Sequence, residues 1–255
     1  MTSARHLRAD RLAPYFDAQL RLAGRMAELT GTPLSDAVLQ FTNLHRRLGF
    51  GVNVLGEVPA PGWLDYARTL EAAPDDPARL TVTLAAFVRG ADEVLPLQGQ
   101  RQFGCFACEA PTEDGAVRLH FNNQDTDEDG GPLATAKIAR RRAELAALVG
   151  HVRAAHPEAR CIRGKSWLYN LDAYRRLFPA DYGASRTVAE GPLRLNGTSS
   201  WGQLIDAHER IRPEMRDALV ASLEALDPAA PWLAFPLRVL ATEAPVDSFA
   251  AEYGV

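Results

Sequence analysis

Apolar side chains recur at helical spacing through the first third of the chain, as expected for helices that each bury one face. Caps and breakers divide this part into four predicted helices, at 10–31, 35–49, 63–73 and 80–88. Pro14 is expected in the first turn of the first helix, where a missing N–H is tolerated. The fourth segment has β-branched residues that favour a strand, but Asp76-Pro77 is a helix start, so we predict a helix. The loop at 49–62 is rich in Gly and Pro and carries a short strand at 52–55.

From about residue 100 onward, alternating apolar and polar positions indicate strands between helices. Strands at 103–109 and 117–121 flank the turn cluster 112–115 and form a predicted hairpin. The other predicted elements are helices at 133–156, 171–178, 201–211 and 213–226, and strands at 159–163, 193–195 and 235–241. The order predicts an α/β fold, with a helical N-terminal region (1–98) packed on a region (99–255) that holds a mixed sheet flanked by helices. We expect the two regions to form one continuous globular unit.

Composition and charge narrow the possible functions. The chain has 255 residues, 47% of them hydrophobic, and a net charge of −4. Without a concentrated basic surface, neither nucleic acid nor an anionic membrane is an expected partner. The first residues lack a signal-peptide core, and no apolar run approaches the roughly 20 residues that span a bilayer. These features predict a soluble, cytoplasmic protein with a small-molecule substrate, and the scarcity of lysine indicates a GC-rich bacterial genome. They leave the oligomeric state open.

Three cysteines are too few for a disulfide framework and fit a reducing compartment. Cys105 and Cys108 have the spacing of a zinc or thioredoxin motif, but no second pair exists and the segment around them is predicted as a strand. Residues three apart on a strand point to opposite faces. We therefore expect both to be small buried side chains, Cys161 to be reduced as well, and no metal to be bound.

An acidic loop follows the predicted hairpin, and it has two interpretations. Its residues Asp125, Asp127, Asp129 and Gly130 match the first half of an EF-hand calcium loop. Ala136 stands where that loop needs a bidentate Glu, and a strand precedes it instead of a helix. We therefore favour a solvated turn, with Gly130-Gly131-Pro132 as breakers and the acids near the positive end of the next helix. A cation site is the alternative.

Gly164-Lys165-Ser166 resembles the end of a phosphate-binding loop. Such a loop needs a glycine five positions before its last glycine, and that position is Ala159. The residues between are better used as a strand. The sequence therefore excludes nucleotide phosphate binding at this point.

Polar side chains gather at the ends of two predicted strands, where sites of α/β proteins usually form. Arg118, His120 and Asn122 share one face of their strand because side chains alternate. The segment 166–174, which includes Ser166, Trp167, Tyr169 and Asn170, follows the next strand. We expect the three strand residues to line a cleft rimmed by the acidic loop. The structural alternative is that Trp167 and Leu168 fill the core while Ser166 caps a helix.

The order hairpin, helix, strand, short helix and later strands resembles the C-terminal half of the GNAT acyltransferase superfamily over residues 117–195. In that family a helix carries Asn-x-x-Ala and then a Leu-Tyr pair, and this chain has Asn170-Leu171-Asp172-Ala173 and Leu177-Phe178. Two departures are visible. Acids follow Gln124 where the family's glycine-rich pyrophosphate loop is expected, and Phe178 replaces the tyrosine that protonates the departing thiolate.

The resemblance implies acyl-CoA as cofactor, with Gly130, Gly131, Arg140 and Arg141 around its pyrophosphate, and an N-acyltransferase activity. His120 or Glu109 would take the proton of the amine, and Tyr174 or Tyr182 would protonate the sulfur. The acidic loop, through Asp125 and Asp127, would attract a cationic acceptor. The competing hypothesis is a non-catalytic ligand-binding or assembly protein, in which Trp167, Tyr169, Tyr174 and Tyr182 line a pocket or an interface.

Overall fold

The computed structural model describes residues 4–51, 59–90, 99–125, 127, 130–197 and 199–255. Its contacts divide the chain into two compact units. The helical unit comprises Met1–Leu95 and Gly191–Pro236, and the sheet unit comprises Pro96–Glu190 and Leu237–Val255. Residues 191–236, which sequence analysis counted with the sheet region, thus belong to the helical unit. The predicted strand at 52–55 lies outside the described residues.

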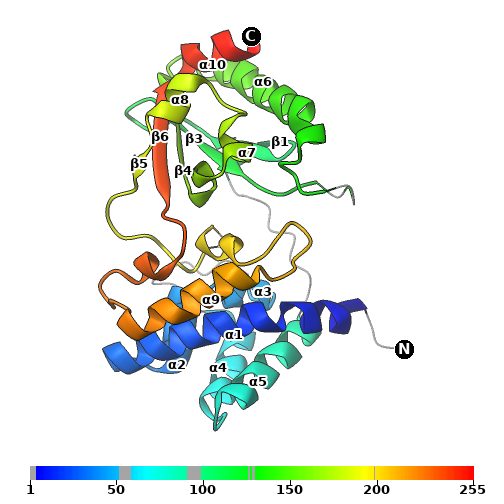
Figure 1. The fold of residues 1–255 in the computed structure, drawn as a ribbon, viewed down its shortest axis with the longest axis vertical. Helices are drawn as coiled ribbons and strands as arrows, with labels where there is room; N and C mark the ends of the chain where they lie inside the picture. Colours follow the sequence, from blue (N-terminus) through cyan, green and yellow to red (C-terminus); the bar gives the residue numbers. More distant parts are fainter. Residues whose placement is uncertain (1–3, 52–58, 91–98, 126, 128–129, 198) are drawn as a thin grey trace. The chain divides into compact units, whose positions relative to one another are not determined.

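The helical unit is built from α-helices and short 3-10 turns (Figure 1). Its elements are α1 (Ala4–Thr30), α2 (Leu34–Phe41), α3 (Leu44–Arg47), α4 (Pro61–Glu71), α5 (Asp76–Arg89), η3 (Ser200–Gln203), α9 (Pro213–Ser222), η4 (Leu223–Ala225) and η5 (Pro231–Ala234). The helix predicted behind Asp76-Pro77 is therefore present as α5. Asp75 caps it, since its carboxylate accepts a hydrogen bond from the N–H of Ala78 at 2.9 Å.

Three predictions for the helical unit were wrong. Helix α1 begins at Ala4, so Pro14 lies inside it and not in its first turn. The single helix predicted at 35–49 is broken between α2 and α3, where the Thr42 hydroxyl donates to the carbonyl of Val38 and accepts from the N–H of Leu44. The helix predicted at 201–211 is only the turn η3, followed by an antiparallel bridge between Ile205 and Ile211.

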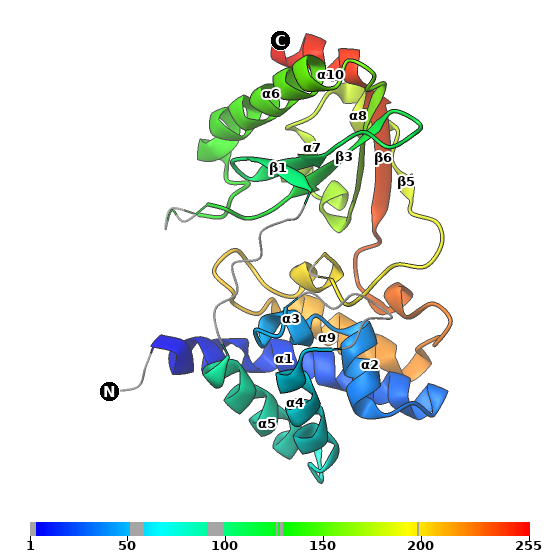
Figure 2. The same cartoon turned by 180° about the vertical axis from the view of Figure 1, so that it is seen from behind.

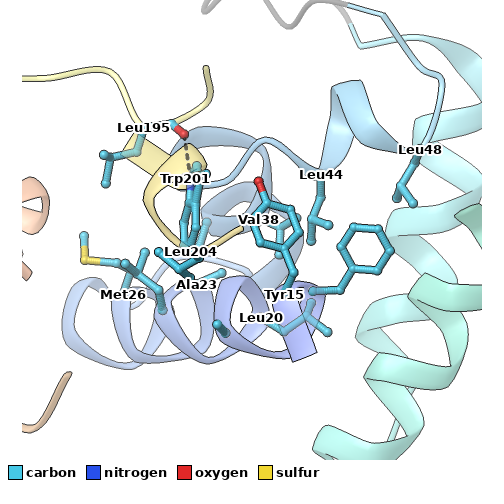
Figure 3. Close-up of a cluster of buried hydrophobic side chains, with 14 of the residues drawn as sticks. Tyr15, Leu20, Ala23, Met26, Val38, Leu44, Leu48, Leu195, Trp201 and Leu204 are labelled. Atoms are coloured by element: carbon cyan, nitrogen blue, oxygen red, sulfur yellow. Dashed lines mark hydrogen bonds between the residues drawn. The ribbon is translucent and has the colours of Figure 1, made fainter. Parts of the chain in front are cut away.

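The core of the helical unit contains side chains from both of its chain segments (Figure 3). Trp201 is fully buried among residues of α1 and α2, and its indole N–H donates to the carbonyl of Leu195 at 2.9 Å. Its ring meets Tyr15 edge-on at 6.4 Å and Phe235 at 4.9 Å. The returning segment 191–236 is thus held by burial of large aromatic side chains.

The sheet unit contains one six-stranded mixed sheet in the order β1-β2-β3-β4-β6-β5. Its elements are β1 (Gln100–Phe103), β2 (Phe106–Glu109), β3 (Ala116–Phe121), η1 (Thr135–Lys137), α6 (Ile138–Ala155), β4 (Cys161–Ser166), η2 (Trp167–Asn170), α7 (Asp172–Arg175), α8 (Ala180–Ala184), β5 (Thr187–Val188), β6 (Leu240–Pro245) and α10 (Val246–Tyr253). Strands β3 and β4 are parallel, and the other neighbours are antiparallel. The predicted α/β class with a mixed sheet and flanking helices is confirmed.

Several strand boundaries differ from the prediction. The strand predicted at 103–109 is two strands, because Gly104, with φ 58°, turns the chain between β1 and β2. The predicted hairpin around 112–115 is present as β2 and β3. The predicted strand at 193–195 is absent, and the final strand begins at Leu240 and continues into α10.

Helices cover one face of the sheet within this unit (Figure 2). Helices α6 and α10 pack side by side and bury side chains of the strands, among them Val117, Leu119 and Ile162. Neighbouring residues on the same strands point the other way, as strand alternation requires. That opposite face carries charged and polar side chains, and we call it the polar face.

Candidate functional site

The polar face is where the predicted strand residues lie. Register places Arg118 of β3 beside Arg163 of β4, and His120 and Lys165 follow on the same face. Arg163 is engaged with Glu243 at 2.6 Å and Asp114 at 3.2 Å. Asn122 donates a long hydrogen bond of 3.4 Å to Gln102. The structure thus brings Arg118, His120 and Asn122 to one surface, as strand alternation predicted.

Glu109 is the centre of this surface. It lies at the end of β2, and its Oε1 is 2.7 Å from Nε2 of His120. Its Oε2 is 3.5 Å from Arg118. Both members of the Glu109–His120 pair are half-buried, with 30% and 28% of their side chains exposed, so a ligand can reach them while water is partly excluded. The pair has the arrangement of a carboxylate that orients an imidazole for proton transfer.

Strands β3 and β4 part beside this pair. Their parallel pairing ends at Leu119 and Gly164, although the strands continue to Phe121 and Ser166. The end of β3 stays paired with β2, and the end of β4 stays paired with β6. The separation therefore belongs to the middle of the sheet, next to His120.

A cavity of about 240 Å³ adjoins Glu109. Its lining residues are Gly99, Gln100, Arg101, Cys108, Glu109, Ala110, His151 and His156. Burial, together with the nearby Arg101 and His156, lowers the pKa of His151, and burial raises the pKa of Cys108 to about 11. Both groups are therefore neutral near pH 7. Sequence analysis identified Glu109 but missed Arg101, His151 and His156, because their elements meet only in the folded sheet.

The acidic loop is neutralised by the protein itself. Asp125 is buried, with 2% of its side chain exposed, and it lies 3.1 Å from Lys137 and 3.2 Å from Arg141. Burial opposes its ionisation, yet the bonds from Lys137 and from the backbone of Asp127 outweigh burial and lower the pKa of Asp125. Arg140 binds Asp127 at 2.9 Å. The cations expected around a pyrophosphate are therefore already paired with carboxylates.

The glycines of this loop have local roles. Gly130 has φ 74°, and its carbonyl accepts a hydrogen bond of 3.4 Å from Lys137. Gly131 accepts the N–H of Ala134 at 3.1 Å in the turn before η1. Arg141 also contacts Glu144 at 3.1 Å and the Sγ of Cys105, and it is itself buried. These contacts connect the loop to the start of α6.

The tyrosines expected as proton donors lie in the core of the sheet unit. Tyr174 and Tyr182 are 1% and 0% exposed, and Tyr169 is 2% exposed. The hydroxyls of Tyr169 and Tyr182 are 2.6 Å apart, and burial raises the pKa of all three well above the usual range. Gly164 leaves the space for these hydroxyls, since a Cβ there would overlap both oxygens.

The segment after β4 is held by internal bonds. The Ser166 hydroxyl caps η2 by accepting the N–H of Leu168 at 3.2 Å, and Trp167 is buried. Asn170 donates to the carbonyls of Trp167 and Arg238 at 2.7 and 2.8 Å. These residues fix the turn between β4 and α7 against the chain entering β6.

The three cysteines form no disulfide. Cys105 and Cys108 are buried free thiols, and burial raises the pKa of Cys161 as well. Among the described residues, no three His, Cys, Asp or Glu side chains are grouped closely enough to hold a metal ion. In the same part of the chain, no helix combines the length and the apolar character needed to cross a bilayer. Comparison with family models, curated proteins and solved structures returned no match.

Proposed function

We propose that the sheet unit transfers an acyl group from a thioester to an amine on the polar face. The observation that carries this proposal is the parting of β3 and β4 beside the Glu109–His120 pair. A thioester laid into the parting can bond to strand backbone, which positions its carbonyl next to the imidazole. The half-buried pair supplies the proton-transfer group that such a reaction needs.

The proposed reaction is a direct displacement. The amine nitrogen attacks the thioester carbonyl while His120 removes a proton from the amine, and Glu109 stabilises the resulting imidazolium. The C–N bond forms, the C–S bond breaks, and the electron pair leaves with the sulfur. The imidazolium then returns the proton to the thiolate, so the products are an amide and a free thiol. No buried tyrosine takes part.

The order of elements also supports the proposal. Parallel strands β3 and β4 are joined by α6 and followed by the short helices η2 and α7, which is the order that resembles GNAT acyltransferases. Asn170 and Ala173, the residues of the Asn-x-x-Ala motif, lie at the junction between η2 and α7. We propose acyl-CoA as the donor. Its pyrophosphate competes with Asp125 for Lys137 and Arg141.

A second candidate is a non-catalytic ligand-binding protein. It is favoured by the same competition, because Asp125 fills the cationic site with a carboxylate of the chain itself. It is also favoured by Phe178, which cannot donate a proton, and by the burial of Tyr174 and Tyr182. In this candidate the polar face binds an amine or an acid without turnover.

Thiol release separates the two candidates. The full chain is incubated with a panel of amines and with either acyl-CoA or the acyl thioester of N-acetylcysteamine, which lacks the pyrophosphate. We expect turnover with both donors, and a loss of about 100-fold or more in His120→Asn and Glu109→Gln. Arg163→Gln changes an arginine of the same face outside the pair and is expected to keep the wild-type rate.

The outcomes distinguish donor from chemistry. If only the N-acetylcysteamine thioester is turned over, acyl transfer is supported and acyl-CoA is excluded as the donor. If neither donor releases thiol with any amine, but one of those amines still stabilises the protein against heat, the ligand-binding candidate is supported and the acyltransferase is excluded.

A further inference from the structure

The edge of the sheet at β1 carries basic side chains on the face that α6 covers. Arg101 and Phe103 of β1 point to this face, because Arg101 pairs with Cys108, which belongs to the core beneath α6. Helix α6 passes over β1 (Figure 2), and the ring centres of His151 and Phe103 are 5.5 Å apart. The guanidinium carbon of Arg101 lies 5.9 Å from the centre of the same Phe103 ring. Arg101 and His151 therefore share one aromatic neighbour.

A second imidazole completes this basic cluster. His156 follows the last residue of α6, and its ring centre lies 5.8 Å from that of His151. Arg101, His151 and His156 all line the cavity of about 240 Å³, together with Cys108, whose buried thiol is neutral. Burial is the first cause that lowers the pKa of His151, and the charges of Arg101 and His156 add to it, so the three groups are within electrostatic range of one another.

These basic groups have hydrogen-bonding capacity that the described part of the chain does not use. Arg101 is exposed, and its guanidinium forms no hydrogen bond or ion pair with a described residue. Neither ring nitrogen of His151 is bonded to a described residue, and neither is a buried unbonded atom, so both are accessible. His156 uses one nitrogen, Nδ1, which lies 3.4 Å from Glu158. An anion in the cavity would supply acceptors to the arginine and to protonated imidazoles.

The acidic groups near the cavity have other environments. Glu109 points to the opposite face of the sheet, where its Oε1 is 2.7 Å from His120. Glu158 is 62% exposed, so solvent screens its pair with His156. The carbonyl end of α6 lies at His156 and favours the imidazolium over the neutral ring. When the imidazoles are protonated, the α6-covered part of the cavity is therefore predominantly positive.

We propose that this cavity binds a small tetrahedral oxyanion of the phosphate or sulfate class, with Arg101, His151 and His156 as its donors. Such an ion has several acceptor oxygens, and arginine and imidazolium donate charge-assisted hydrogen bonds to them. The volume lies below the range of about 300–1,000 Å³ typical of ligand pockets, which suits an inorganic oxyanion or a small monoester and not a nucleotide. Arg101 and His151 lie on the face opposite His120, so the site does not depend on the proposed acyl transfer.

Sulfate is the first probe, because it remains a dianion over the whole pH range of the test, whereas phosphate changes its charge. It is titrated into the full chain by calorimetry at about pH 5.5 and about pH 7.5. We expect a Kd of about 1 mM or lower at the acid pH and about tenfold weaker binding at the higher pH, since protonation of the imidazoles adds positive charge. Sulfate should also raise the pKa of His151 towards its ordinary value, measured by NMR of its ring C2 proton, because a bound anion favours the imidazolium.

Variants assign the donors. Arg101→Gln is expected to weaken sulfate about tenfold at both pH values, because it removes a permanent charge. His151→Gln should weaken sulfate about tenfold at the acid pH only. The control is Arg153→Gln, which removes the same charge from α6 outside the cavity lining, where Arg153 bonds the carbonyl of Val255, and it should keep wild-type affinity. Circular dichroism of each variant confirms that it is folded.

The site is supported if Arg101→Gln and His151→Gln weaken sulfate as stated and Arg153→Gln does not. The absence of saturable binding up to about 10 mM at the acid pH overturns it. Wild-type affinity in Arg101→Gln, or a pKa of His151 that sulfate leaves unchanged, also overturns it. Inorganic phosphate and glycerol phosphate are then compared at the higher pH. Tighter binding of glycerol phosphate supports a monoester as the ligand, and equal or weaker binding supports the free ion.

Discussion

Glu209 in the helical unit and Glu109 in the sheet unit are both carboxylates held by basic side chains, but their surroundings differ. Glu209 lies 2.6 Å from Arg8 and 2.7 Å from Arg47. Burial opposes its ionisation, yet the two arginines outweigh burial and lower its pKa to about 2. Glu109 bonds a single imidazole closely and lines a cavity. A carboxylate enclosed by fixed arginines stabilises the fold, whereas one with an open side is available to a ligand.

The backbone supports this distinction. Glu209 has φ 60°, the left-handed conformation that costs a residue with a Cβ roughly 1–2 kcal/mol. It lies in a tight turn in which the N–H of Asp206 donates to the carbonyl of Arg210 at 2.8 Å, a place where glycine or asparagine would be less strained. The carboxylate compensates, because it connects the returning segment to α1 and α3 through Arg8 and Arg47.

The first test of the comparison is Glu209→Gln, with the largest expected effect on stability. The amide keeps the size of the side chain but removes the charge, so one neutral acceptor oxygen faces two partly buried arginine cations. We expect the free energy of unfolding to fall by about 2 kcal/mol, measured by denaturant titration. The control is Glu243→Gln, whose exposed pair with Arg163 should contribute less than about 1 kcal/mol. Equal losses in both variants would show that Glu209 is an ordinary surface pair.

The pH dependence of stability tests the same role of Glu209, with a smaller expected effect. Because the folded pKa of Glu209 is about 2, below its ordinary value of 4.5, its contribution is fully present above pH 4.5 and is lost as the pH falls towards 2. Wild type should therefore lose about 1–2 kcal/mol more than Glu209→Gln between pH 5 and pH 2. If the free energy of unfolding of the two proteins changes with pH in parallel, the ionised carboxylate of Glu209 does not stabilise the fold.

Local signals in the sequence were sufficient for elements whose ends are set by neighbouring residues. Helix α5 follows from Asp76-Pro77, and the β2–β3 hairpin follows from its turn cluster. The helix prediction for 201–211 was wrong because tertiary contacts determine the conformation of this segment. Trp201 is fully buried in the helical core, and Glu209 reaches arginines of α1 and α3, so the chain bends there instead of continuing as a helix.

In the candidate site, the sequence likewise predicted the residues placed by local strand geometry but not those brought together by tertiary packing. Strand alternation places His120 with Arg118, and antiparallel pairing brings Glu109 to them, since Cys108 lies opposite Leu119. Strands β2 and β3 and most of α6 separate Arg101 from His151 in sequence, so only the packing of α6 against β1 and β2 brings them together. The pairing of Asp125 with Lys137 and Arg141 depends likewise on how the loop folds back onto α6.

The mildest change, Tyr182→Phe, decides whether a buried tyrosine belongs to the scaffold or to the chemistry. Its hydroxyl bonds that of Tyr169 at 2.6 Å in a core where Tyr182 is 0% exposed. If Tyr182 has only a structural role, the variant should lose about 1 kcal/mol in free energy of unfolding and keep the wild-type rate of thiol release. The matched control is Tyr253→Phe, which removes a hydroxyl bonded to the carbonyl of Leu177 at 2.7 Å and should behave alike. If Tyr182 instead protonates the leaving thiolate, as the acyltransferase resemblance implies, its variant alone should lose about 100-fold in rate with little change in stability. That result would move the reacting atoms from the polar face to the helix-covered side of the sheet, where Tyr182 lies, and the contrast between Glu109 and Glu209 would no longer locate the active site.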